Sequence, residues 1–229
     1  DERGSELFDA ICELPEYYLT RAENEVLVRR AADIARLVGP GAVLVEFGSG
    51  ATEKVRRLLE ALRPAGYLGI DISREFLTAA TARLARDCPW LPVHAACADF
   101  SQPLALRYPP PGSTRLVFFP GSSIGNFTPA GAVEFLAHQR ELVGADGGFV
   151  IGVDLKKDER VLHAAYNDAA GVTAAFNRNL LVRMQRELNA DLDVDGFEHD
   201  AVYDAAAGCI DMYLVSQRAQ SIRIDDHEF

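Results

Sequence analysis

The chain has 229 residues, of which 48% are hydrophobic and 25% are charged, a composition typical of a globular protein with a sizeable core. Its formal net charge of -11 argues against a nucleic-acid partner, because binding to phosphates requires clustered lysine and arginine side chains. Since no apolar stretch reaches the roughly 18 residues of a membrane helix and no signal-peptide pattern opens the chain, we expect a cytoplasmic protein without a membrane partner.

The four cysteines, Cys12, Cys88, Cys97 and Cys209, lie far apart in the sequence. None of them belongs to a CxxC pair or has a histidine at the spacing of a zinc ligand. This pattern disfavours both a disulfide framework and a metal site. We therefore expect buried free thiols and no bound metal.

Residues 1–40 predict an N-terminal helical segment, running from Ser5 to about Val38. Pro15 interrupts it, and the glycines and proline at 39–41 end it. The segment contains Tyr17 and Tyr18, whose apolar rings and hydroxyl groups suit either core packing or a ligand contact.

Residues 41–155 alternate between strand and helix patterns, which is typical of a parallel sheet flanked by helices. This region therefore predicts a Rossmann-like α/β domain, in which ligands bind where the strands end. The predicted strands are 42–47, 67–71, 92–97, 115–119 and 148–153, and the predicted helices are about 52–63, 74–86 and 129–143.

Gly48-Ser49-Gly50 follows the first predicted strand, and its glycines allow the backbone to turn sharply and approach a ligand. A dinucleotide fingerprint requires a third glycine where Glu53 stands, which disfavours a nucleotide-dependent oxidoreductase. An acidic residue two positions before the first glycine, here Glu46, is usual in enzymes that use S-adenosylmethionine (SAM). We interpret this run as a SAM site; the alternative is a tight turn beside a surface aspartate.

Further candidates for cofactor binding stand at the ends of other elements. Asp71 ends the second strand, where a carboxylate can accept hydrogen bonds from both hydroxyls of a ribose. Asp99 and Phe100 follow the third strand and offer a carboxylate, a ring and a backbone amide to an adenine, although Asp99 also suits a helix N-cap. Lys54 is placed to reach the carboxylate of the methionine moiety, or else is a solvated surface lysine.

The loop from Phe118 to Phe127 places two glycines, two hydroxyls and an amide between aromatic residues. Such a loop suits polar recognition within an apolar wall. Asn126 carries both a donor and an acceptor, so its side chain can bind the carboxylate and the amine of an amino acid. The alternative is an asparagine that caps its own backbone turn.

Residues 156–229 predict an appended lobe, with a long helical stretch at about 158–190 followed by strands at 198–204 and 209–224. Tyr166 lies in the helical stretch and is a further candidate for a ligand contact or for core packing.

Segments spread over nearly the whole chain closely resemble one family, the histidine Nα-methyltransferases of ergothioneine biosynthesis. The resemblance includes the motif Glu46-Phe47-Gly48-Ser49-Gly50 and the Asp99-Phe100 pair. The matching segments are 1–8, 14–21, 46–50, 97–100, 118–127, 152–158 and 165–177.

This resemblance implies a class I methyltransferase domain with an additional substrate lobe, present as a monomer. The implied reaction is SAM-dependent trimethylation of the α-amino group of L-histidine to hercynine, with S-adenosyl-L-homocysteine (SAH) as the other product. By motif, the implied cofactor residues are Gly48, Ser49, Gly50, Lys54, Asp71, Asp99 and Phe100. The implied histidine-binding residues are Asn126, Tyr166 and one of Tyr17 and Tyr18, with Tyr17 favoured, in a pocket also lined by Phe8, Gly121 and Ser123.

Two departures from the family leave the substrate open. Family members carry residues before Asp1, and they continue past Phe229 into a segment whose acidic and hydroxyl residues bind the imidazole. The alternative is therefore a shortened relative that binds SAM but methylates another amino acid or is catalytically silent. Because no histidine or lysine stands out as a base, we expect Asn126 and the Tyr17-Tyr18 pair to carry the catalytic roles, with a tyrosine hydroxyl or a water relay accepting the proton.

Overall fold

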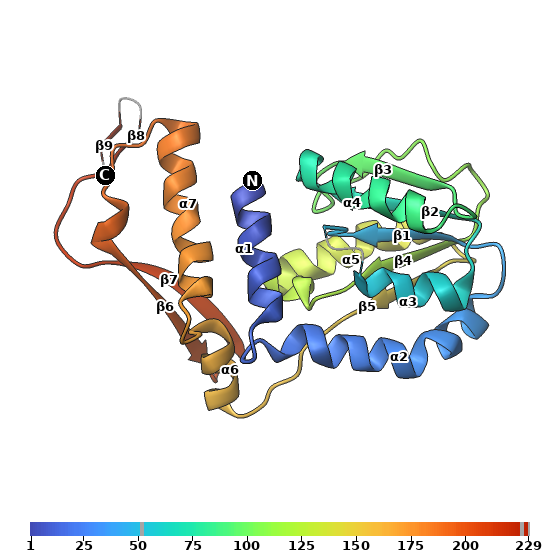
Figure 1. Cartoon of the computed structure of the whole chain (residues 1–229), viewed down its shortest axis with the longest axis horizontal. Coiled ribbons are helices and arrows are strands. Elements are labelled where there is room, and N and C mark those ends of the chain that lie inside the picture. Colours follow the sequence, from blue (N-terminus) through green and yellow to red (C-terminus); the bar gives the residue numbers. More distant parts are fainter. Residues whose placement is uncertain (51–52, 225–226, 229) are drawn as a thin grey trace. The chain divides into compact units, whose positions relative to one another are not determined.

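The computed structural model describes residues 1–50, 53–224 and 227–228, and it divides into two compact units. The sheet unit comprises residues 19–154, and the hairpin unit comprises residues 1–18 and 155–229 (Figure 1). The predicted N-terminal segment is thus divided between them. Helix α1 (Glu2–Glu13) belongs to the hairpin unit, whereas α2 (Tyr18–Val38) lies in the sheet unit from Leu19 onward.

Five parallel strands form the centre of the sheet unit, in the order β3-β2-β1-β4-β5. This arrangement confirms the predicted parallel sheet of an α/β fold. Strands added after β1 extend the sheet first to one side and then to the other, so the order reverses between β1 and β4. The strands are β1 (Val43–Phe47), β2 (Gly66–Asp71), β3 (Val93–Cys97), β4 (Arg115–Phe119) and β5 (Gly148–Ile151).

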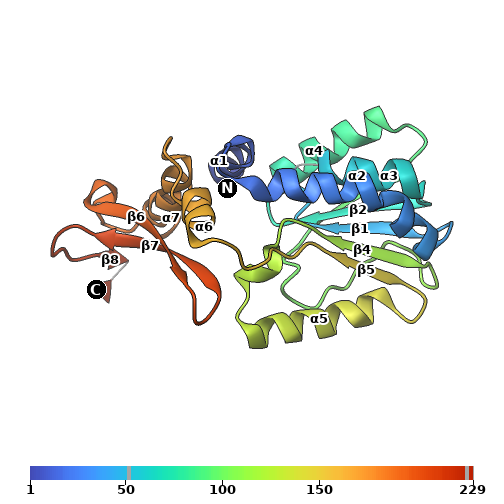
Figure 2. The ribbon, with the colours of Figure 1, turned by 90° about the horizontal axis from the view of Figure 1, so that it is seen from below.

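Helices cover both faces of this sheet (Figure 2). Helices α2, α3 (Glu53–Leu62) and α4 (Arg74–Asp87) lie on one face, and α5 (Pro129–Val143) lies on the other. Thr128 caps α5 by accepting a hydrogen bond from the Gly131 N–H at 3.2 Å, with proline in the first turn. The predicted strand 148–153 proved two residues too long, since β5 ends at Ile151.

Two hydrophobic clusters, one on each face, hold the helices to the sheet. Leu27 of α2, Leu58 of α3 and Leu84 of α4 pack together on the first face. On the second face, Phe47 and Phe119 pack with Phe135 of α5. Every residue of β1 is buried, because helices cover both sides of this central strand, and this explains why all its residues but Glu46 are apolar.

Among the residues that the structure describes, the hairpin unit contains α1, two further α-helices, a short 3-10 helix and two antiparallel strand pairs. The predicted helix 158–190 is wrong as one continuous helix, because a turn separates α6 from α7. There the Asp168 carboxylate accepts hydrogen bonds from the N–H groups of Val172 and Thr173 at 2.8 Å, which caps α7 after Gly171 at φ +72°. The elements are α6 (Glu159–Tyr166), α7 (Val172–Leu188), η2 (Val194–Gly196), β6 (Phe197–Asp204), β7 (Cys209–Ser216), β8 (Arg223–Ile224) and β9 (His227–Glu228).

The predicted strand 209–224 also proved too long. Strand β7 ends at Ser216, opposite Phe197, the first residue of β6. Beyond this point β6 has no further residue with which β7 can pair, and β8 begins separately at Arg223.

The cysteine expectation was partly wrong. All four cysteines are free thiols, but Cys97 and Cys209 are exposed and Cys12 and Cys88 are only half-buried. Within the described ranges, the helices are too short or too polar to cross a bilayer.

Candidate functional site

The turn after β1 lies against the end of β2. The N–H of Gly48, a residue at φ +70°, donates a hydrogen bond to the Ile70 carbonyl at 2.9 Å. A Cβ on Gly50 would lie 2.8 Å from Cε1 of Phe76 and 3.8 Å from Oδ2 of Asp71. Glycine is therefore needed at position 50 because the Phe76 ring of α4 packs directly on the backbone, next to the Asp71 carboxylate.

Asp71 is the last residue of β2, as predicted, and its side chain is half-buried. Burial raises the pKa of this carboxyl group above its ordinary value, although the backbone N–H groups of Ser73 and Ile72 partly offset the effect. The Ser73 N–H donates to Oδ1 at 2.8 Å. A partly desolvated carboxylate at a strand end is a strong acceptor for hydroxyl groups.

Glu46 lies in the core directly before the turn, with only 1% of its surface exposed. The Tyr67 hydroxyl donates a hydrogen bond to Glu46 Oε2 at 2.5 Å. Burial raises the pKa of Glu46 to about 8, against the lowering effects of Tyr67 and Lys54. Glu46 is therefore mainly protonated at neutral pH and is buried directly before the glycine turn.

Glu46 makes the stability of the sheet unit depend on pH. The carboxyl group titrates near pH 4.5 in the unfolded chain and near pH 8 in the folded chain, so its contribution is fully present below pH 4.5 and is lost as the pH rises to about 8. We expect the urea midpoint of the wild type, followed by Trp90 fluorescence, to fall between pH 5 and pH 8 relative to that of Glu46→Gln. Glu75→Gln, at an exposed position of α4, is the control. Equal pH slopes for the wild type and Glu46→Gln would contradict the buried titration.

Lys54, in the first turn of α3, is not a solvated surface lysine. Its Nζ lies 2.7 Å from Oε2 of Glu23, and the two side chains are only 17% and 15% exposed. A Cβ on Gly121 would lie 3.7 Å from this Nζ, so Lys54 is adjacent to the loop after β4. Glu23 is a residue that sequence reasoning missed, because an acidic residue on a polar stretch of helix is usually solvated.

Asp99 and Phe100 follow β3, but their side chains lie in different surroundings. Asp99 is exposed, and hydrogen bonds from the side chain and backbone of Ser101 lower its pKa. The Ser101 N–H donates to Oδ1 at 2.9 Å within a turn, so the helix N-cap alternative is not the arrangement found. The Phe100 ring stacks on Phe47, with 5.4 Å between centroids, and therefore contributes to the core.

The loop after β4 is built on unusual backbone conformations. Gly121 and Ser122 have φ of +78° and +58°. The Ser123 hydroxyl donates to the Pro120 carbonyl at 3.0 Å, and the Ser122 hydroxyl accepts from the Asp154 N–H at 3.0 Å. Since non-glycine residues rarely adopt positive φ, this loop is held in a conformation that local sequence does not favour.

Asn126 ends the short helix η1 (Ser123–Asn126) and is exposed. Among the hydrogen bonds of the described residues, none involves its side-chain amide. The alternative in which Asn126 caps its own turn is therefore not the arrangement found, and its donor and acceptor face outward.

The hairpin unit brings three of its predicted residues together. Tyr17 is 7% exposed, and its ring centroid lies 6.1 Å from the ring centroid of Tyr166 and 6.5 Å from that of Phe8. Tyr18 points elsewhere: its hydroxyl accepts a hydrogen bond from Lys157 Nζ at 2.8 Å, and this ammonium also lies 4.5 Å from the ring centroid. The geometry thus gives the two adjacent tyrosines different surroundings.

Tyr166 is held in place through its backbone. Its carbonyl oxygen lies 2.8 Å from Nε2 of His199, and Nδ1 of the same ring lies 3.0 Å from the Asn177 amide nitrogen. The Asn177 amide also donates to the Tyr213 carbonyl at 2.9 Å. This network ties the end of α6 to the hairpin and is a second feature that sequence reasoning missed.

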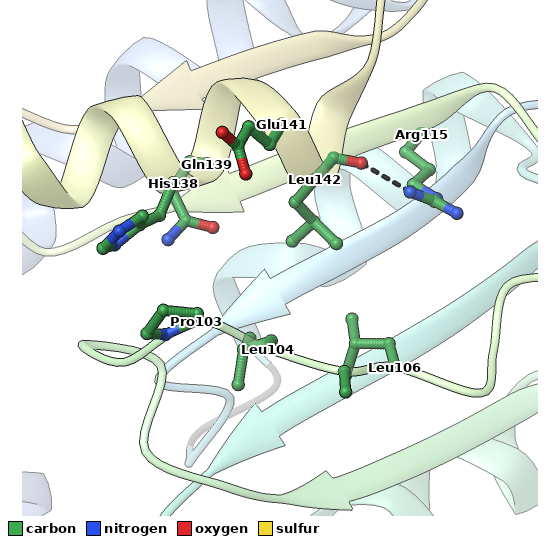
Figure 3. A pocket seen from close by; sticks show the side chains of 9 residues that line it. Pro103, Leu104, Leu106, Arg115, His138, Gln139, Glu141 and Leu142 are labelled. Atoms are coloured by element: carbon green, nitrogen blue, oxygen red, sulfur yellow. Dashed lines mark hydrogen bonds between the residues drawn. The ribbon is translucent and has the colours of Figure 1, made fainter.

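A cavity of about 320 Å³ lies elsewhere in the sheet unit (Figure 3). It lies between the segment Pro103–Leu106 and the second half of α5, beside Arg115, whose guanidinium donates to the Leu142 carbonyl at 2.6 Å. Arg115 begins β4, whereas the loop with Gly121 follows the end of that strand. The cavity lining among the described residues contains none of the predicted site residues.

The whole chain is similar to known proteins. Residues 1–229 match the family described as histidine-specific methyltransferase, SAM-dependent. The histidine N-alpha-methyltransferase of Mycolicibacterium smegmatis is 43% identical over 228 residues, which cover 98% of this chain and 70% of that protein. Its namesake from Mycobacterium tuberculosis is 42% identical with the same coverage. Ergothioneine biosynthesis protein 1 of Neurospora crassa is 33% identical over 220 residues, which cover 91% of this chain and 25% of that protein.

Proposed function

Because the chain belongs to the family of histidine-specific, SAM-dependent methyltransferases, we propose that it trimethylates the α-amino group of L-histidine to hercynine. The observation that carries this proposal is 43% identity to a histidine N-alpha-methyltransferase over 98% of the chain. The arrangement of glycine turn and carboxylate at the carboxyl ends of β1 and β2 supports it, because this is where an open α/β sheet binds a nucleoside.

The side chains of the sheet unit fit the separate parts of SAM. Asp71 would accept hydrogen bonds from the ribose hydroxyls, and the turn at 48–50 would let the cofactor approach the backbone. Lys54 would bind the carboxylate of the methionine moiety. Asp99 would accept from the adenine amino group, with the backbone amide of Phe100 beside it, since the Phe100 ring is stacked on Phe47.

Each unit carries residues that we propose bind the amino-acid substrate. Asn126 offers an outward-facing donor and acceptor, which match the carboxylate and the amine of histidine. Tyr17 and Tyr166 would contribute the aromatic wall with Phe8, whose ring packs against Tyr17. Gly121 and Ser123 would line the same pocket through the loop that carries Asn126.

SAM, when bound, supplies a methyl group activated by a sulfonium centre. The protein must present histidine with a neutral α-amine, because a protonated amine has no lone pair for attack. The free α-amino group of an amino acid has a pKa near 8 or above, so a proton must first leave. We propose that Asn126 orients the amine and that a tyrosine hydroxyl, or water beside it, relays the proton to solvent. The main contribution of the site is alignment of the two substrates.

The test of this function is a product assay with a panel of amino acids. The purified chain is incubated with labelled SAM and each amino acid in turn, and the products are analysed by mass spectrometry. We expect histidine alone to acquire one, two and three methyl groups. Methylation of a different amino acid would overturn the substrate and keep the enzyme class. Binding of SAM without any methylated product would instead indicate a catalytically silent module.

The different surroundings of the two tyrosines allow their roles to be separated. We expect Tyr17→Phe to weaken histidine binding roughly tenfold through loss of one hydrogen bond to a charged substrate, with the aromatic contacts to Tyr166 and Phe8 retained. Tyr18→Phe is the matched control, because its hydroxyl accepts from Lys157, and we expect a change below about twofold. Calorimetry with SAH present measures both affinities. The opposite pattern would assign the substrate contact to Tyr18.

A further inference from the structure

Glu23 of α2 connects three separate parts of the sheet unit. Its Oε2 lies 2.7 Å from Lys54 Nζ at the start of α3. Its Oε1 accepts a hydrogen bond from the Gly121 N–H at 2.8 Å, in the loop after β4. The carboxylate is thus held between the start of α3 and the loop after β4.

The backbone leaves room for this carboxylate at the end of β5. A Cβ on Gly152 would lie 2.2 Å from Oε1 of Glu23, so position 152 has to be glycine while Glu23 occupies this place. The charges of Glu23 and Lys54 also act on the buried Glu46, the former raising and the latter lowering its pKa. Both charged groups therefore act on Glu46, the residue two positions before Gly48.

Stabilisation of the fold does not by itself explain a buried ion pair between Lys54 and Glu23. Removing two charges from water costs free energy that their attraction often fails to recover, and apolar residues of similar volume usually stabilise a core as well or better. With side chains only 17% and 15% exposed, Lys54 and Glu23 are largely desolvated. A largely buried cation and anion, held side by side at the ligand-binding edge of the sheet, suit a ligand that itself carries both charges.

We propose that Glu23 binds the α-ammonium group of the methionine moiety of SAM, while Lys54 binds its carboxylate. The inference rests on the proposed use of SAM at this edge of the sheet. Each oxygen of a carboxylate has two lone pairs, so Glu23 retains acceptor capacity beyond its bonds to Gly121 and Lys54. The zwitterionic end of the cofactor then meets a pair of opposite charges already fixed in position.

The test compares three ligands by calorimetry. They are SAH, the analogue of SAH that lacks only the α-amino group, and 5′-methylthioadenosine, which lacks both the amine and the carboxylate. The wild type should bind SAH at least about tenfold more tightly than the deaminated analogue, as expected for a hydrogen bond between charged groups. Glu23→Gln should weaken SAH binding about tenfold and change the binding of the other two ligands less than about twofold.

Glu25→Gln is the matched control, because Glu25 is an exposed residue of the same helix that pairs with Arg29. Glu23→Asp, which keeps the charge, serves if Glu23→Gln does not fold, and should also reduce the preference for SAH over its deaminated analogue. An equal loss for all three ligands would show that Glu23 only supports the loop, and unchanged SAH binding would likewise overturn the proposal. Failure of the wild type to bind SAH at all would overturn the proposed function instead.

Discussion

Replacement of Asn126 with alanine should lower kcat/KM for histidine by at least about 100-fold. Two hydrogen bonds to the charged amine and carboxylate of the substrate contribute roughly 1.5–3 kcal/mol each, and alanine can make neither. The change should leave the fold intact, because Asn126 is exposed and its amide takes no part in the hydrogen bonds of the described residues.

Calorimetry separates this substrate role from an effect on the cofactor. Asn126→Ala should bind SAH as the wild type does and should show weak or undetectable binding of histidine in the presence of SAH. Asn126→Asp is the companion variant: it has the same shape, but its carboxylate repels that of histidine and lacks the amide donor. Unchanged histidine affinity in Asn126→Ala would remove Asn126 from the site.

For the cofactor, the largest effect is expected from Asp71→Asn, which should weaken SAH binding by about 10-fold to 100-fold. An asparagine has only one acceptor oxygen, so it cannot accept hydrogen bonds from both ribose hydroxyls while Ser73 N–H keeps its bond to Oδ1. The loss of one hydrogen bond to a charged group accounts for roughly 1.5–3 kcal/mol.

The control for this variant is Asp146→Asn, at an exposed position in the turn before β5. It removes the same charge from the same unit, but it lies before a strand, whereas Asp71 is the last residue of one. Asp146→Asn should therefore bind SAH with the wild-type affinity. A similar loss in both variants would indicate a general effect of charge, and no loss in Asp71→Asn would place the ribose elsewhere.

Local pattern was sufficient to predict most of the sheet unit. Mainly apolar runs such as Val43–Phe47 belong to strands covered on both faces, and every strand of the parallel sheet was located to within two residues at its ends. The strand ends at Gly48 and Asp71, and the loop after β4 that carries Asn126, could be located in the sequence for the same reason. The carboxyl ends of parallel strands lie along one edge, so sequence position alone predicts which residues share it.

Predictions that depended on distant partners were less successful. The helix 158–190 is divided because Asp168 caps α7, and the strand after 209 ends where β6 has no further residue to pair with. The Phe100 ring, predicted beside an adenine, stacks on Phe47, a contact that the sequence did not indicate. For the strand and the ring, the deciding contact is made by a residue outside the local window from which the prediction was drawn, whereas the Asp168 cap lies within the predicted helix itself.

The sequence by itself determined the α/β class, the succession of strands and helices along the chain and the residues at the strand ends. These features follow from local periodicity, from glycine and from chain direction. Only the tertiary structure decided that Glu46 is buried against Tyr67 and that Lys54 is paired with Glu23. These are contacts between residues of separate elements, and the charge and protonation of such groups depend on burial and on neighbours in space. No pattern along the chain records those neighbours, so the fold had to be known before the charges of the site could be assigned.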